Sequence, residues 1–209
     1  MRQDDVAWLR GHAFLLLVDV AMDTAAVRRG VVAARESGLA GVVVAPSHLS
    51  AVGDVGDLTV AAVVGFPTGR HHSLVKAAEA RLAVAQGATE VWVSPDIGVS
   101  DLNTLLAEFV AVREAVPPPV QLGIVVETGL RDEQAIHSIV QAAAVAGADR
   151  VVTQSGWWPD EGTENPPLGG QPGVRLTVAG LHNLDEVLGA LERGADRVAI
   201  ADLGVVLEA

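Results

Sequence analysis

The chain has 209 residues, half of them apolar, and a net charge of −12 at neutral pH. This length and apolar content predict one compact domain over residues 1–209, and the acidic balance without a basic cluster argues against nucleic acid or an anionic membrane as partner. No apolar run could span a bilayer, the first residues lack a secretion signal, and no cysteine is available for disulfides or thiolate chemistry. We therefore expect a cytoplasmic protein.

Short apolar runs alternate with longer amphipathic runs along the whole chain. The apolar runs predict strands at residues 14–20, 41–45, 58–64, 90–94, 120–127, 150–153, 174–178 and 197–201. The amphipathic runs predict helices at residues 24–37, 73–86, 102–116, 132–146 and 184–193. Continuous apolar strands separated by helices are typical of a parallel sheet that is covered on both faces.

A glycine recurs where a predicted helix gives way to the next strand. It is found in Ser37-Gly38-Leu39-Ala40, Gly87-Ala88-Thr89, Gly147-Ala148-Asp149 and Gly194-Ala195-Asp196. Glycine in this place can end a helix in a left-handed conformation. Eight strands with this repeated connection predict a closed (β/α)8 TIM barrel. A doubly wound open sheet is the alternative, but the chain lacks the Gly-x-Gly-x-x-Gly turn of that fold.

The segment after the sixth predicted strand differs from the other connections. Between Ser155 and Pro172 lie four prolines, four glycines and no helical periodicity. Four prolines cannot all lie inside one helix, because each removes a backbone donor and clashes with the preceding turn. We therefore predict that the sixth helix is replaced by a long loop that contains Trp157 and Trp158.

Three short motifs occur in a recognisable order along the chain. They are Val18-Asp19-Val20 in the first predicted strand, Gly65-Phe66-Pro67-Thr68-Gly69 after the third and Glu127-Thr128 at the end of the fifth. In these motifs, and over nearly its whole length, the chain resembles the deoxyribose-phosphate aldolase family. The resemblance implies an aldolase-type barrel with its active site at the carboxyl ends of the strands.

The catalytic positions of the family hold other residues in this chain. The resemblance implies a Schiff-base lysine on strand six, where Val152 stands, and a second lysine on strand seven, where Arg175 or Leu176 stands. It also implies an aspartate on strand four, where the chain has Trp92, and phosphate-binding serines after strand eight, where it has residues 199–202. These departures predict a divergent member without Schiff-base chemistry.

The only lysine, Lys76, lies in a predicted helix, where the family also has a lysine that forms no Schiff base. We expect it to be solvated or paired with Glu79, three residues further along the same helix.

Tryptophan and valine at the former charged positions predict an apolar barrel mouth for a mainly apolar, non-phosphorylated small molecule. For Trp92 the alternative is that it only fills the barrel. The side chains expected to bind the substrate are Trp92, Val152, Gln154, Trp157, Trp158 and Arg175.

Three carboxylates are the candidates for catalysis: Asp19, Glu127 and Asp202. An apolar pocket raises the pKa of a carboxyl group, because desolvation disfavours its charged form, and such a group can transfer protons near neutral pH. This favours lyase, isomerase or ring-forming chemistry, in a specialised metabolic pathway by analogy. A structural role for Glu127, bonded to a neighbouring strand or to Arg175, is the alternative.

Two other function classes remain open: a non-catalytic descendant that binds a ligand or partner, and a metal-dependent aldolase or lyase. His71 and His72 follow the third-strand turn, but adjacent histidines do not face a common centre, and no His-x-His or His-x3-His spacing exists. We therefore predict no metal and no cofactor. A missing outer helix would leave strands six and seven thinly covered, which favours a homodimer.

Overall fold

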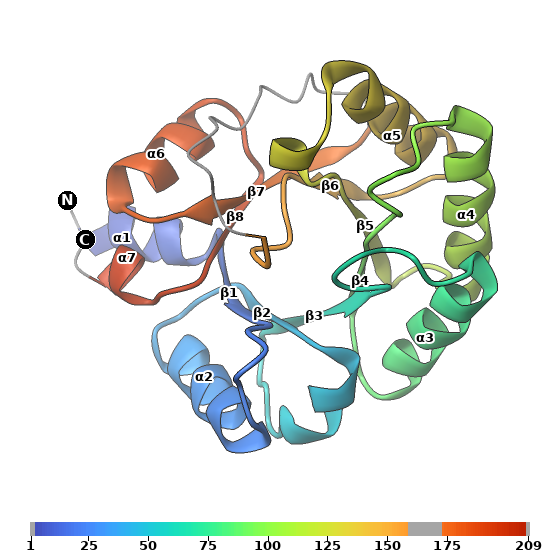
Figure 1. The fold of residues 1–209 in the computed structure, drawn as a ribbon. Helices are drawn as coiled ribbons and strands as arrows, with labels where there is room; N and C mark the ends of the chain where they lie inside the picture. Colours follow the sequence, from blue (N-terminus) through green and yellow to red (C-terminus); the bar gives the residue numbers. More distant parts are fainter. Residues whose placement is uncertain (1–2, 159–172, 208–209) are drawn as a thin grey trace.

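The computed structural model describes residues 3–158 and 173–207 (Figure 1). Within these ranges, eight parallel strands follow one another in sequence order around a closed barrel. They are β1 (Ala13–Leu17), β2 (Gly41–Val44), β3 (Thr59–Val64), β4 (Glu90–Val93), β5 (Gln121–Val125), β6 (Arg150–Val152), β7 (Arg175–Leu181) and β8 (Arg197–Ile200). The ring closes where Phe14 of β1 lies beside Ala199 of β8. The predicted (β/α)8 barrel is confirmed.

The longer helices that follow the strands form most of the outer ring (Figure 1). They are α2 (Thr24–Glu36), α3 (Ser73–Ala85), α4 (Leu102–Ala115), α5 (Glu133–Val145) and α6 (Leu184–Glu192). Each agrees with a predicted helix to within about one residue at either end. Local caps explain the agreement: Asp23, Asp101 and Asp132 each accept a hydrogen bond from a backbone N–H of the first turn that follows. None of the described helices has the length and apolar character needed to cross a membrane.

Four short elements were not predicted from the sequence. Two helices, α1 (Gln3–Arg10) and α7 (Gly204–Leu207), contact each other near the chain ends (Figure 1), and Arg10 Nε donates to the carbonyl of Val206. The 3-10 turns η1 (Pro46–Ala51) and η2 (Thr128–Leu130) follow β2 and β5. These elements are too short for a clear period, since helical periodicity needs about three turns to stand out.

The loop predicted in place of the sixth helix falls mostly on residues 159–172, which lie outside the described residues. From Gly156 to Trp158 the described chain is not helical. The absence of a helix in the rest of this segment stays a prediction.

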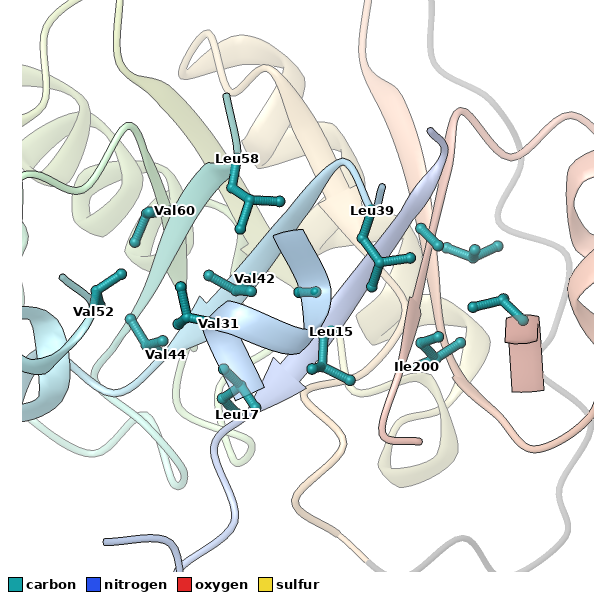
Figure 2. Packing of buried hydrophobic residues seen from close by; sticks show 14 of the residues in the cluster. Leu15, Leu17, Val31, Leu39, Val42, Val44, Val52, Leu58, Val60 and Ile200 are labelled. Carbon is teal, nitrogen blue, oxygen red and sulfur yellow. The ribbon is translucent and has the colours of Figure 1, made fainter. Parts of the chain in front are cut away.

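Side chains along each strand point alternately outward, toward the helices, and inward, toward the barrel axis, so the barrel has an outer and an inner hydrophobic core. Leu15 and Leu17 of β1 face outward and pack with Val42 of β2 and Val31 of α2 (Figure 2). The residues between them face inward, where they meet the inward residues of the other strands. The buried inner cluster consists of Phe14, Leu16, Val18, Val43, Ala61, Val63, Trp92, Val125, Val152, Ala179 and Ala199.

A charged layer closes the amino-terminal end of the barrel. Glu90 at the start of β4 is fully buried and lies 2.9 Å from both Arg150 Nε and Arg197 Nη1. Arg150 also donates to Thr177 Oγ1 and lies 3.2 Å from Asp196. Buried charges need partners of this kind, because an isolated charge would be strongly disfavoured away from water. The accessible end of the barrel is therefore the one at which the strands terminate.

Candidate active site at the barrel mouth

A cavity of about 420 Å3 opens at the carboxyl ends of the strands. Its walls come from the end of β1, the segment after β6 and the residue after β8. The lining residues are Leu16, Val18, Asp19, Val20, Met22, Gly156, Trp157 and Ala201. The location is that of active sites in barrels of this type, because the loops that follow the strands converge there.

Among the described residues that line the cavity, Asp19 is the charged one. It follows β1, is exposed, and its Oδ1 accepts a hydrogen bond of 2.7 Å from the backbone N–H of Ala21. The turn thus fixes the carboxylate at the cavity, where it can accept hydrogen bonds from hydroxyl groups of a ligand.

Glu127 is buried at the end of β5, with 3% of its surface exposed. Among the described residues it is the one non-glycine with a positive φ, 53°, in the left-handed region. Such a conformation is strained for a residue with a Cβ, and strained residues cluster at functional sites. Oε1 accepts a hydrogen bond of 3.2 Å from the N–H of Ser155, which connects the ends of β5 and β6.

Burial raises the pKa of Glu127, because desolvation disfavours the carboxylate. Hydrogen bonds from Ser155 and the charge of Arg131 oppose the rise. The cation that acts on this carboxyl is thus Arg131. Arg175, the partner considered from the sequence, is not involved.

Arg131 holds the loops around Glu127 in place. Its guanidinium donates to five backbone carbonyls, those of Pro95, Asp96, Ile97, Val99 and Val126. The β4 loop and the end of β5 are therefore tied together by one side chain. With its donors engaged in this way, Arg131 acts as a support of the site.

Asp202 follows β8 and is exposed. Its Oδ1 accepts a hydrogen bond of 2.8 Å from the N–H of Gly204, at the start of α7. Asp202 is not among the residues that line the cavity, although its neighbour Ala201 is. Its proposed role in proton transfer stays a prediction.

Trp157 is the aromatic side chain among the described residues of the cavity wall. Its ring meets the edge of Phe66 at 5.2 Å between ring centres, so the turn after β3 supports the segment after β6. Trp158 follows it and is partly buried. Gln154 donates from Nε2 to the carbonyl of Ala179 at 2.9 Å, which orients its amide toward β7.

Trp92 and Val152 lie inside the barrel, beneath the mouth, and both are fully buried. The Trp92 indole N–H donates to Glu90 at 2.6 Å, and its ring stacks on Phe14 at 6.4 Å. Neither residue lines the cavity. Trp92 thus fills the barrel, which is the alternative that the sequence left open for it.

The expected position of Arg175 at the mouth is wrong. Arg175 is the first residue of β7 and lies beside Arg150 in the register of the sheet. It is therefore at the amino-terminal end of the barrel, opposite the cavity.

Lys76 is fully buried between α3 and α4. Nζ donates to Glu108 Oε1 at 2.8 Å and to the carbonyl of Ser94 at 3.0 Å. Burial raises the pKa of Glu108, and Lys76 opposes that rise. The expected pair with Glu79 is wrong, since Glu79 Oε2 accepts from the N–H of Gly65 at 2.8 Å.

Three residues near the carboxyl ends of the strands were not singled out from the sequence as site residues: Phe66, Ser94 and Arg131. Ser94 could have been found from strand alternation, because it lies two residues after the inward-facing Trp92.

His72, which was considered from the sequence as a metal ligand, caps α3 through Nδ1, which accepts a hydrogen bond from the N–H of Leu74. In the described ranges, no three His, Asp or Glu side chains are grouped so that they could hold a metal ion.

Comparison with known proteins yields several deoxyribose-phosphate aldolases. The chain is 39% identical to that of Corynebacterium glutamicum over 171 residues, 77% of each chain. It is 36% identical to that of Nocardia farcinica, with 84% of this chain and 82% of the relative covered. For Mycobacterium marinum the identity is 34%, with 99% and 95% covered. No family model matches the chain.

Solved structures agree with the barrel fold. The aldolase QR15 superposes with a TM-score of 0.88 at 24% identity and covers 96% of this chain and 95% of its own. A tetrameric deoxyribose phosphate aldolase from Aeropyrum pernix superposes with a TM-score of 0.85 at 24% identity, covering 99% and 92%.

These relatives correct the function expected from the sequence. They are named for an aldolase of a sugar phosphate, which is a lyase. The expectation of isomerase or ring-forming chemistry, and of a mainly apolar, non-phosphorylated substrate, is therefore wrong. Nothing in the comparison supports a specialised pathway. Identity above 30% over at least three quarters of both chains establishes that this chain belongs to the deoxyribose-phosphate aldolase family.

Proposed function

We propose that the chain is a lyase that performs aldol chemistry at the barrel mouth on a small hydroxylated carbonyl compound of the deoxyribose-phosphate kind, without a lysine imine. One observation supports the absence of a lysine imine. The sole lysine is fully buried and ion-paired between two outer helices, while Val152 occupies the inner face of β6. No other side-chain amine exists in the sequence, so an imine with a lysine of the mouth cannot form.

An aldol cleavage without an imine needs a base and a group that stabilises the enolate. The base removes the proton of the β-hydroxyl, the adjacent carbon–carbon bond breaks, and its electron pair passes into the carbonyl group to form an enolate. One aldehyde leaves, and the enolate then takes the proton back on carbon to give the second carbonyl product. Atoms and charge balance with no further reactant.

Glu127 is the proposed base. A carboxyl whose pKa is raised by burial is a better base than a solvated one, and it also returns its proton more readily at neutral pH than a group of much higher pKa. Asp19 is proposed to bind substrate hydroxyls in the cavity, with Asp202 as a second carboxylate beside the wall. Trp157, supported by Phe66, would exclude water from one side of the ligand.

Borohydride reduction should leave no adduct on a side chain of this protein. After treatment with acetaldehyde or deoxyribose phosphate and then reduction, Lys76 should remain unmodified, because its side chain is buried and ion-paired with Glu108. Mass spectrometry of the intact protein and of its peptides is the measurement. A Val152→Lys variant, checked for folding by circular dichroism, restores an amine on β6 and serves as the matched control. Reduction onto Lys76 itself would refute the imine-free proposal.

We further propose that the chain self-associates through α3. This helix exposes Leu74, Val75 and Leu82 to solvent, with exposed fractions of 54–67%, and the similar aldolase of Aeropyrum pernix is described as tetrameric. The contact through strands six and seven, considered from the sequence, stays a prediction, because most of the segment between these strands lies outside the described residues.

Changing Leu82 to Glu should shift the protein from an oligomer to a monomer in light scattering, because a charge in an apolar contact loses its hydration. Val145→Glu, at an equally exposed position on α5, should leave the mass unchanged. A wild-type protein that is monomeric at high concentration would contradict the assignment.

A further inference from the structure

Ser94 carries a buried hydroxyl group that has no hydrogen-bond partner. The residue follows β4 and is 1% exposed, and its Oγ finds neither a donor nor an acceptor among the residues that the structure describes. Among the described residues it is the one buried hydroxyl in this situation. By contrast, the buried Thr153 Oγ1 accepts from the N–H of Ala179 at 3.0 Å. Most buried polar atoms are satisfied, so an exception needs a physical explanation.

The position of Ser94 in the strand directs its side chain toward the barrel axis. Trp92 belongs to the inner cluster, whereas Val91 and Val93 belong to the outer one. Ser94 continues this alternation, because its N–H bonds to the carbonyl of Val64 at 2.9 Å in the pattern of the parallel ladder. The hydroxyl thus lies above Trp92, on the side of the barrel where the mouth opens.

Two hydrogen bonds hold the backbone of Ser94 in place. Its N–H bonds to β3, and its carbonyl accepts from Lys76 Nζ at 3.0 Å. The alkyl stem of Lys76 also packs closely on Gly65, where an added Cβ would lie 2.9 Å from Lys76 Cε. The buried lysine therefore positions Ser94 and the neighbouring strand end together.

We propose that Ser94 is a substrate-binding residue whose hydroxyl donates a hydrogen bond to the carbonyl oxygen of the bound compound. The inference rests on the proposed aldol function, since that oxygen carries the negative charge of the enolate once the carbon–carbon bond breaks. A donor that is fixed in advance and shielded from water stabilises such a charge more than a mobile solvated donor. Because Ser94 is buried, a ligand entering past Asp19 must reach it with its inner end, and the mouth must open locally.

Replacing Ser94 with alanine separates a ligand-binding role from a structural one. Removal of an unsatisfied buried hydroxyl should leave the melting temperature unchanged or raise it, whereas the affinity for deoxyribose phosphate and kcat/KM should fall by about tenfold or more. Ser94→Cys, of similar size but a weaker donor, should behave in the same direction. The matched control is Thr153→Val, which removes a hydroxyl with an internal partner and should lower the melting temperature.

Two results would overturn the assignment. If Ser94→Ala melts at a clearly lower temperature, the hydroxyl has a partner such as a buried water and is structural. If the variant is as stable as the wild type and binds equally well, the hydroxyl does not touch the ligand.

The binding measurement also separates this inference from the proposed function. A wild type that binds deoxyribose phosphate but does not cleave it refutes the proposed reaction and leaves the Ser94 comparison valid. If the wild type does not bind deoxyribose phosphate, the role of Ser94 is tested with glycolaldehyde and dihydroxyacetone, by the change in melting temperature that each compound causes. A shift that Ser94→Ala loses supports the assignment, and no shift in the wild type overturns it.

Discussion

Replacing Glu127 with glutamine is expected to lower the turnover of the aldol reaction by about 100-fold or more while the barrel stays folded. The amide keeps an oxygen that can accept from the N–H of Ser155 but cannot take a proton from the substrate. Steady-state kinetics should therefore show a loss in kcat larger than any change in KM. Glu133→Gln, a change of the same type on the exposed first turn of α5, should leave turnover unaltered.

The pH dependence provides a second test of Glu127. Burial raises the pKa of Glu127, so the rate should increase with pH, with a midpoint above the pKa of an ordinary glutamate. The Glu127→Gln variant should not show this increase of rate with pH.

The stability should follow the opposite course. A carboxyl group whose pKa is higher in the folded than in the unfolded state stabilises the fold fully at pH values below its pKa in the unfolded state. This stabilisation is lost as the pH rises through the pKa in the folded state. The wild type should therefore lose stability relative to Glu127→Gln across that interval, as measured by urea denaturation at several pH values. Identical kinetics of the two proteins at all pH values would show that Glu127 only bridges β5 and β6.

Replacing Lys76 with methionine is expected to reduce the free energy of unfolding by about 3 kcal/mol or more, as for other buried ion pairs that lose one partner. Glu108 would remain largely buried without its counter-charge, and the carbonyl of Ser94 would lose its donor. Denaturation in urea measures the effect. The loss should diminish at low pH, because protonation of Glu108 removes the unpaired charge.

The double variant Lys76→Met, Glu108→Leu is the control for this interpretation. It removes both charges, so it should be clearly more stable than the single variant at neutral pH. A loss below about 1 kcal/mol in Lys76→Met would instead indicate the solvated helical lysine that its sequence position suggested.

The function was misjudged because Trp92 and Val152 were assigned to the surface of a pocket. Both side chains are buried inside the barrel. There the indole N–H of Trp92 also donates a hydrogen bond to the buried carboxylate of Glu90. An aromatic residue on an inward strand position can belong to the core or to a site. Only its depth along the barrel axis, which depends on all eight strands, distinguishes the two.

The barrel could be predicted from the amino-acid sequence alone, because local patterns along the chain encode its strands and helices. Apolar runs, capping aspartates and glycines after the helices place the strands and the main helices to within a few residues. The sequence also shows that no lysine lies on a strand. The strand β7 was placed less well: it continues to Leu181, beyond its predicted end at residue 178, and Arg175 is its first residue. Arg175 was therefore expected at the wrong end of the barrel.

Which charged and polar side chains pair with one another became clear from the folded barrel and not from the sequence. Lys76 pairs with Glu108, 32 positions away, and Glu127 takes a left-handed backbone with its carboxylate bonded to Ser155. Neither arrangement follows from local preference, since a lysine favours a partner on its own helix and a glutamate disfavours positive φ. Packing of helices and strand ends that are distant in sequence overrides these preferences. The free energy gained from tertiary contacts and from pairing buried charges is larger than the cost of departing from the local backbone and side-chain preferences.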